Sequence, residues 1–146
     1  MYIKVITVGK SHDPKISQAI DEYAKRLSRY VKMDWHVIPA SSIQDESAGI
    51  NKLLNGSYVI LLDERGVELS TPEFADRLEK LQNNSVKKLT FVIGGAFGVT
   101  EDVKKRADFI WSLSPLVFPH QLVRLVLVEQ LYRAYDIMHG GSYHHS

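Results

Sequence analysis

The last residues of the chain combine an aromatic ring with side chains that can exchange protons. They are Tyr143, His144 and His145, and they follow Gly140 and Gly141. Histidine titrates near neutral pH, so either of the two can act as a base. Chain ends are more commonly disordered than catalytic. The sequence therefore allows two interpretations of this tail, a disordered end or a catalytic element that docks on a substrate.

Charged side chains interrupt the apolar segment that precedes the tail. Glu129 and Arg133 lie four residues apart and can pair on one face of a helix. Arg124 lies about half a turn out of phase with Arg133. This spacing favours a structural ion pair at a subunit interface. The alternative assigns one of the two arginines to a phosphate or to a substrate carbonyl group.

A glycine-rich segment, Gly94-Gly95-Ala96-Phe97-Gly98, follows a predicted strand directly. Glycine lets a ligand approach the backbone closely and tolerates positive φ. Taken alone, the pattern is more often a plain tight turn than a ligand site. The apolar segment from Leu113 to Phe118 offers a second wall with free backbone amides, which would suit an adenine ring.

Strand patterns alternate with helix patterns along the chain, which predicts an α/β fold with a mostly parallel sheet of five or six strands and helices on both faces. The predicted strands cover residues 2–8, 33–38, 58–62, 89–93 and 109–113, with a turn at 63–66. Helices are predicted to begin at Asp13-Pro14, at 70–73 and at 100–102. A short helix is expected to end near 55–56, and a long one covers Gln121 to Met138.

Three of the predicted loops follow strand ends: the loop after Leu62, residues 94–98 and residues 112–120. Ligands bind outside the carboxyl ends of the strands in open α/β sheets, so we expect these loops to form the walls of one pocket. The long final helix is apolar on nearly all sides and must be covered on most of them. In a chain this small, we expect a second subunit to provide one of the covers.

The composition is that of one soluble domain, which we expect to span residues 1–146. Cysteine is absent, and no apolar run approaches the roughly 20 residues that cross a bilayer, so we expect a cytoplasmic protein without membrane contact. No histidine pair has metal-ligand spacing with a third ligand nearby, so we expect no metal. The net charge of +1 argues against wholesale wrapping of nucleic acid.

Several blocks of the chain together resemble one family, the ribosomal RNA large-subunit methyltransferases that methylate N3 of a pseudouridine, within the trefoil-knotted SPOUT superfamily. The resemblance covers essentially the whole chain, and the blocks that carry it are Val8-Gly9-Lys10, Phe91 to Gly98, Ser112 to Ser114, Phe118 to Arg124, Glu129 to Ala134, and Tyr143-His144. Two segments depart from the family pattern. Residues 39–58 are shorter than usual, and Gly141-Ser142 stand before Tyr143 where other residues are common.

The resemblance implies a C-terminal trefoil knot that binds S-adenosyl-L-methionine, and a homodimer in which the tail of one subunit reaches the pocket of the other. The implied cofactor residues are Leu62, Gly94, Leu113, Ser114, Pro115, Leu116, Val117 and Phe118. The implied substrate is 23S ribosomal RNA within the large subunit or the whole ribosome.

For the reaction we expect His144 to be the base, Tyr143 to position the ring, and Arg124 or Arg133 to offset the negative charge that develops on the imide. Two other functions fit the same residues less well. One is a flavodoxin-like module that binds a nucleotide or flavin without catalysis, and the other is a catalytically silent dimer that binds RNA.

Overall fold

The computed structural model describes residues 1–145, and strands and helices alternate throughout it. In chain order the elements are β1 (Tyr2–Val8), α1 (Pro14–Leu27), β2 (Lys32–Ile38), α2 (Ile43–Asn51), β3 (Tyr58–Glu68), α3 (Thr71–Asn83), β4 (Lys88–Ile93), α4 (Glu101–Arg106), β5 (Phe109–Ser112) and α5 (His120–Met138). The predicted alternation is confirmed.

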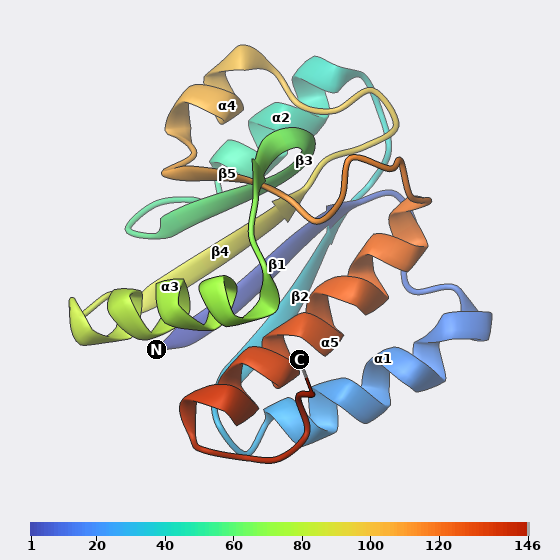
Figure 1. The fold of residues 1–146 in the computed structure, drawn as a ribbon. Helices are drawn as coiled ribbons and strands as arrows, with labels where there is room; N and C mark the ends of the chain where they lie inside the picture. The colour runs from blue at the N-terminus through green and yellow to red at the C-terminus, as the bar shows by residue number, and fades with distance from the viewer. Residues whose placement is uncertain (146) are drawn as a thin grey trace.

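All strand pairs are parallel and form one five-stranded sheet in the order β2-β1-β4-β3-β5. The central strand β4 is buried from Leu89 to Ile93, as expected for a strand that helices cover on both faces. Figure 1 shows α1, α3 and α5 on one side of the sheet and α2 and α4 on the other. The carboxyl ends of the strands therefore meet at one edge of the molecule.

Apolar side chains on the two faces form two separate cores. The larger core joins the sheet to α1, α3 and α5, and aromatic rings lie at its centre, with Phe74 stacked on Trp111 at a centroid distance of 4.1 Å. The smaller core packs α2 and α4 against the opposite face through residues such as Ile50 and Val103. No helix within residues 1–145 combines the length and the apolar character needed to cross a membrane.

Capping residues explain why two of the helices begin where the sequence predicts. The Asp13 carboxylate accepts the amide of Lys15 at 2.9 Å, and Pro14 occupies the first helical position. Before α3, Ser70 and Glu73 form a reciprocal capping box. Both arrangements satisfy amides that the first turn of a helix leaves without partners.

Some predicted boundaries are wrong. The third strand does not end at Leu62, because β3 continues through a bulge and pairs Val67 and Glu68 with β5. Gly66 makes this possible, since a Cβ there would lie 2.6 Å from the Ile110 carbonyl oxygen. Thus residues 63–66 belong to an irregular strand rather than to a turn. Helix α2 ends at Asn51, four residues before the predicted end, and α5 begins one residue earlier than predicted.

Candidate functional site

The three predicted loops do meet, and they enclose a cavity of about 430 Å³ at the carboxyl edge of the sheet. Of the eight residues predicted to bind the cofactor, seven line this cavity, and Pro115 does not. The lining residues are Leu61 to Arg65, Ile93 to Val99, Leu113, Ser114, Leu116, Val117, Phe118, His120 and Val123.

The glycine segment forms one wall because its backbone turns tightly. The Gly98 amide donates to the Gly95 carbonyl at 3.0 Å, and Gly98 has a φ of +79°, in the left-handed region that favours glycine. A Cβ at Gly94 would lie 3.0 Å from Val99 Cγ1, and one at Gly95 would lie 2.6 Å from the buried Glu46 carboxylate. Side chains at either position would displace the turn. The tight turn thus requires glycine at both positions, and the segment lines the cavity.

A second wall follows β5, where a short turn leaves apolar side chains uncovered. The Ser114 hydroxyl accepts the Leu116 amide at 3.0 Å, and the Ser112 hydroxyl donates to the Ser114 carbonyl at 2.9 Å. Leu116 and Val117 are 68% and 78% exposed, which is unusual for such large apolar residues. A flat apolar ligand could cover both of them.

The third wall is the irregular part of β3, where Asp63 pairs with Arg65. Burial alone would raise the pKa of the Asp63 carboxyl group, but hydrogen bonds from the Arg65 amide and guanidinium outweigh it and hold this pKa below its ordinary value. Asp63 is therefore a charged acceptor at the cavity rim near neutral pH.

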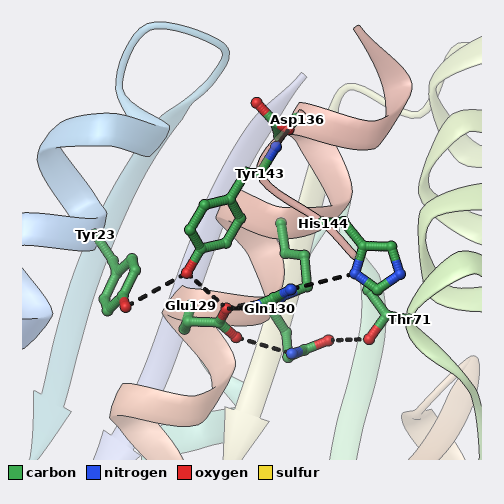
Figure 2. A network of polar contacts seen from close by, with 8 residues as sticks. Tyr23, Thr71, Glu129, Gln130, Asp136, Tyr143 and His144 are labelled. Atoms are coloured by element: carbon green, nitrogen blue, oxygen red, sulfur yellow. Dashed lines mark hydrogen bonds and ion pairs between the residues drawn. The ribbon is translucent and has the colours of Figure 1, made fainter. Parts of the chain in front are cut away.

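The tail lies elsewhere, against the far part of α5, where it forms a polar cluster (Figure 2). Arg133 pairs with Glu129 at 2.6 Å, as the spacing predicts, and its guanidinium lies 4.5 Å from the centre of the Tyr143 ring. The Tyr143 hydroxyl donates to the Glu129 carboxylate at 3.1 Å, and it lies 3.4 Å from the Tyr23 hydroxyl, which can donate to it. His144 Nδ1 lies 3.2 Å from the Arg133 guanidinium. The structure thus brings together Tyr143, His144, Arg133 and Glu129, which the sequence singled out, and adds Tyr23 from α1.

The contacts of this cluster determine which atoms of Tyr143 and His144 donate or accept. Burial, with hydrogen bonds to Tyr23 and Glu129, raises the pKa of the Tyr143 hydroxyl above its ordinary value, so Tyr143 stays neutral and donates. Arginine can only donate, so Nδ1 of His144 is the acceptor in its contact with Arg133.

Arg124 does not join the cluster. It is 1% exposed and lies under the loop between β1 and α1, where its guanidinium is 3.3 Å from His12 Nδ1. His12 contacts Trp35 edge to face at 4.4 Å, and Gln121 holds the same loop through the Asp13 amide at 2.9 Å. Within the described residues, the Arg124 Nε has no hydrogen-bond partner. Burial lowers the pKa of Arg124, and burial together with Arg124 lowers the pKa of His12.

The pocket and the tail cluster of one chain are far apart. Val123 lines the cavity and Arg133 holds His144, and both residues lie on α5. Ten residues of α-helix correspond to about 15 Å. The candidate base therefore does not lie in the cavity of its own chain.

Several residues that contact these sites could not be recognised from the sequence pattern. Glu46 and Ser47 support the glycine segment from α2, His12 contacts Arg124, and Tyr23 and Asp136 contact the tail. Each is a common polar residue whose partner is distant in sequence or is a backbone group. Across the part of the chain that the structure describes, no cluster of His, Asp or Glu side chains could hold a metal ion.

Together these features define an α/β domain with a ligand pocket at the carboxyl ends of its parallel strands. The chain belongs to the SPOUT methyltransferase family, whose model, described as "Predicted SPOUT methyltransferase", matches residues 1–144. It is 42% identical to the Ribosomal RNA large subunit methyltransferase H of Flavobacterium johnsoniae and also to that of Alkaliphilus oremlandii, with 99% of each chain covered in both cases.

Solved structures agree with this assignment at the level of the fold. A probable methyltransferase from Bordetella pertussis has a TM-score of 0.56 at 10% identity, with 91% of this chain and 95% of that chain covered. The SpoU methyltransferase AviRb from Streptomyces viridochromogenes, solved in complex with AdoMet, has a TM-score of 0.50 at 11% identity and covers 97% of this chain and 59% of its own. The predictions of a SPOUT fold and of a methyltransferase are confirmed.

Proposed function

We propose that this protein transfers a methyl group from S-adenosyl-L-methionine to N3 of a pseudouridine in 23S ribosomal RNA, in the cytoplasm. The observation that carries the proposal is the cavity where the three loops meet, in a chain that belongs to a methyltransferase family. The names of the curated relatives support ribosomal RNA as the substrate.

The cavity suits this cofactor in shape and chemistry. Its volume of about 430 Å³ lies in the ordinary range for small-molecule sites. Gly94 would let a ligand approach the backbone, and Leu116 and Val117 provide uncovered apolar surface for an adenine ring. When bound, S-adenosyl-L-methionine would supply a methyl group from a positively charged sulfur. The remainder of the cofactor would then leave as a neutral thioether. Leu62, Leu113, Ser114 and Phe118 complete the enclosure.

A homodimer would bring the two separated groups together. If α5 of one subunit packs antiparallel to α5 of its partner, the amino-terminal half of each helix, with the cavity, faces the carboxyl-terminal half of the other, with the tail. Two-fold symmetry then creates two equivalent composite sites. Partly buried apolar residues along α5, including Leu125 and Val126, are available for this contact, and Leu122 is 39% exposed.

Within such a site, His144 takes the proton from N3 of the pseudouridine, and the nitrogen then accepts the methyl group. In the single chain, Nδ1 of His144 already accepts from Arg133 and so has no lone pair free. We infer that Arg133 exchanges this partner for an imide oxygen of the substrate. The exchange frees Nδ1 and places a positive charge beside the developing anion. Of the two candidate arginines, accessibility favours Arg133, whose side chain is 24% exposed, since Arg124 is buried under a loop.

The net charge of +1 bears on the form of the substrate. Affinity for naked RNA depends largely on neutralised phosphates, and a nearly neutral protein neutralises few of them. We therefore propose that the assembled large subunit or the whole ribosome is the substrate and that its shape supplies the recognition.

The test is transfer of labelled methyl groups to free 23S RNA, isolated large subunits and whole ribosomes, followed by nucleoside analysis. Label in N3-methylpseudouridine, with particles better than free RNA, is the expected result. Equal rates on free RNA would contradict the role of the assembled particle. Absence of transfer, with calorimetric binding of flavin or nucleotide instead of S-adenosyl-L-methionine, would favour a flavodoxin-like binding module. Binding of RNA without methyl transfer would indicate a silent RNA-binding dimer.

A further inference from the structure

Asp136 is a buried acid that contacts the tail rather than solvent. It lies in the last turn of α5 and is 6% exposed. Its carboxylate accepts the backbone amide of Tyr143 at 3.0 Å, and its carbonyl accepts the amide of Gly141 at 2.8 Å. No cation is paired with it among residues 1–145. Burial of a carboxyl group is unfavourable unless hydrogen bonds compensate it, and the Tyr143 amide supplies such a hydrogen bond to the Asp136 carboxylate.

The backbone of the tail bends closely around this carboxyl group. A Cβ built at Gly141 would overlap the Asp136 carboxylate, so a side chain at position 141 requires one of the two to move. The preceding Gly140 has a φ of +71°, which starts the reversal of the chain after the helix. Asp136 and Gly141 therefore depend on each other, which explains a glycine at a position where the tail departs from its family's pattern.

The bend determines where the next two side chains point. With its amide held by Asp136, Tyr143 directs its ring against Tyr132, at a centroid distance of 4.8 Å, and its hydroxyl toward Glu129. The Nδ1 atom of the following residue, His144, lies 3.2 Å from the Arg133 guanidinium. In Figure 2 the His144 ring lies on the side of Tyr143 away from Tyr23. One backbone contact thus orients both of the proposed catalytic side chains.

We propose that Asp136 is a positioning residue, which fixes the tail so that Tyr143 and His144 are presented as a preformed pair. The proposal rests on the proposed function, because it matters only if the tail takes part in methyl transfer. It requires no contact between Asp136 and the substrate. The contact orders Tyr143 and His144 before the substrate binds. Less conformational entropy is therefore lost when the reaction reaches the transition state.

The main test compares Asp136→Ala with Asp136→Asn, since asparagine keeps an oxygen acceptor for the Tyr143 amide. We expect Ala to lower kcat for methyl transfer by roughly 100-fold, the order of loss that a misplacement of about 1 Å can cause. Asn should restore most of this loss. The affinity for S-adenosyl-L-methionine, measured by calorimetry, and the KM for ribosomal particles should stay within about twofold of wild type. Amide hydrogen exchange at Tyr143 should become faster in Ala alone.

Gly141→Ala provides a second route to the same perturbation, because its side chain forces the tail and the Asp136 carboxylate apart without a substitution in the helix. It should reproduce the loss of kcat even if Asp136→Ala folds poorly. Ser142→Ala, at an exposed neighbouring position, is the matched control and should behave as wild type.

The outcomes separate the two proposals. If the wild-type protein transfers no methyl group to ribosomal RNA, the proposed function fails. If the wild type is active and both Asp136→Ala and Gly141→Ala retain its kcat, the positioning role alone is wrong. A loss of cofactor affinity that parallels the loss of kcat would also overturn it, because the effect would then be structural.

Discussion

A composite site makes a quantitative prediction for mixed dimers. One variant carries Gly94→Val, which blocks the cofactor loop because even a Cβ there would lie 3.1 Å from the carbonyl carbon of Gly98. The other variant carries His144→Ala, which removes the proposed base and leaves the loop intact. Each homodimer should be inactive. A heterodimer with one chain of each kind should have about half of the wild-type rate.

The expected half of the wild-type rate follows from the distance between the cavity and His144 along α5. His144 is held about 15 Å from the cavity wall of its own chain, measured by the rise of the helix. Reacting atoms must approach to about 3.5 Å, so a tail can serve only the partner's cavity while α5 is intact. In the heterodimer, the intact cavity of the His144→Ala chain faces the intact tail of the Gly94→Val chain. The second cavity is blocked and also faces a tail without His144.

The assay uses co-expression with two affinity tags, purification of the doubly tagged dimer, and labelled methyl transfer to ribosomal particles. The control is a heterodimer of wild type with a chain that carries both substitutions. That pair should be inactive, because each site contains one defective half. The opposite pattern, half activity in this control and none in the first pair, would refute the composite site. A monomer in solution would refute it as well.

Two further predictions concern residues outside the tail. The lowered pKa of His12 means that the unfolded chain binds a proton more readily than the folded one, so the free energy of unfolding should fall as pH drops below about 6.5 and should be unaffected above it. His12 faces Arg124, which lowers its pKa, and Asp21, which opposes this. The free energy of unfolding is measured by denaturant titration at pH 7.5 and at pH 5.5. His12→Gln should reduce the difference between the two values, whereas His145→Gln should leave it unchanged. An equal difference in His12→Gln and wild type would contradict the assignment. Phe97 is 88% exposed at the cavity mouth, so Phe97→Ala should change stability by less than about 0.5 kcal/mol. If the ring stacks on a base of the RNA, KM for the particle should rise by about tenfold with unchanged cofactor affinity, Phe97→Trp should restore it, and an unchanged KM would exclude stacking.

The location of the pocket was predictable because it depends on a rule of topology. Buried runs such as residues 89–93 identify parallel strands, and the loops at their carboxyl ends must lie together. The pairing of Glu129 with Arg133 was predictable for a similar reason, since residues four apart on a helix are neighbours. Both inferences use local spacing, which a sequence displays directly.

The extension of β3 was not predictable from apolar patterning. Beyond Leu62 the strand is held to β5 through backbone pairing, while Val67 is 55% exposed and Glu68 faces solvent. A hydrophobic run therefore stops before the strand does. The signal that was present is Gly66, whose missing side chain permits the close approach of Ile110.

Long-range polar contacts were equally hidden. His12 and Arg124 lie 112 positions apart, and nothing in either local sequence indicates their contact. The partner of the Asp136 carboxylate is a backbone amide, which every residue except proline possesses. An acid on an apolar helix is ordinarily solvent-exposed, so its role became visible only once the turn at Gly141 was known.

The cavity contains one histidine of its own, and its surroundings differ from those of the proposed base. Within the described residues, His120 is the only histidine that lines the cavity, and it is the first residue of α5. His144 instead belongs to a cluster that contains the Glu129 carboxylate, which can offset an imidazolium once Arg133 has moved to the substrate. The protein would thus hold the cofactor in a cavity lined by glycine backbone and apolar side chains, and remove the proton with a group that only the partner subunit can bring near.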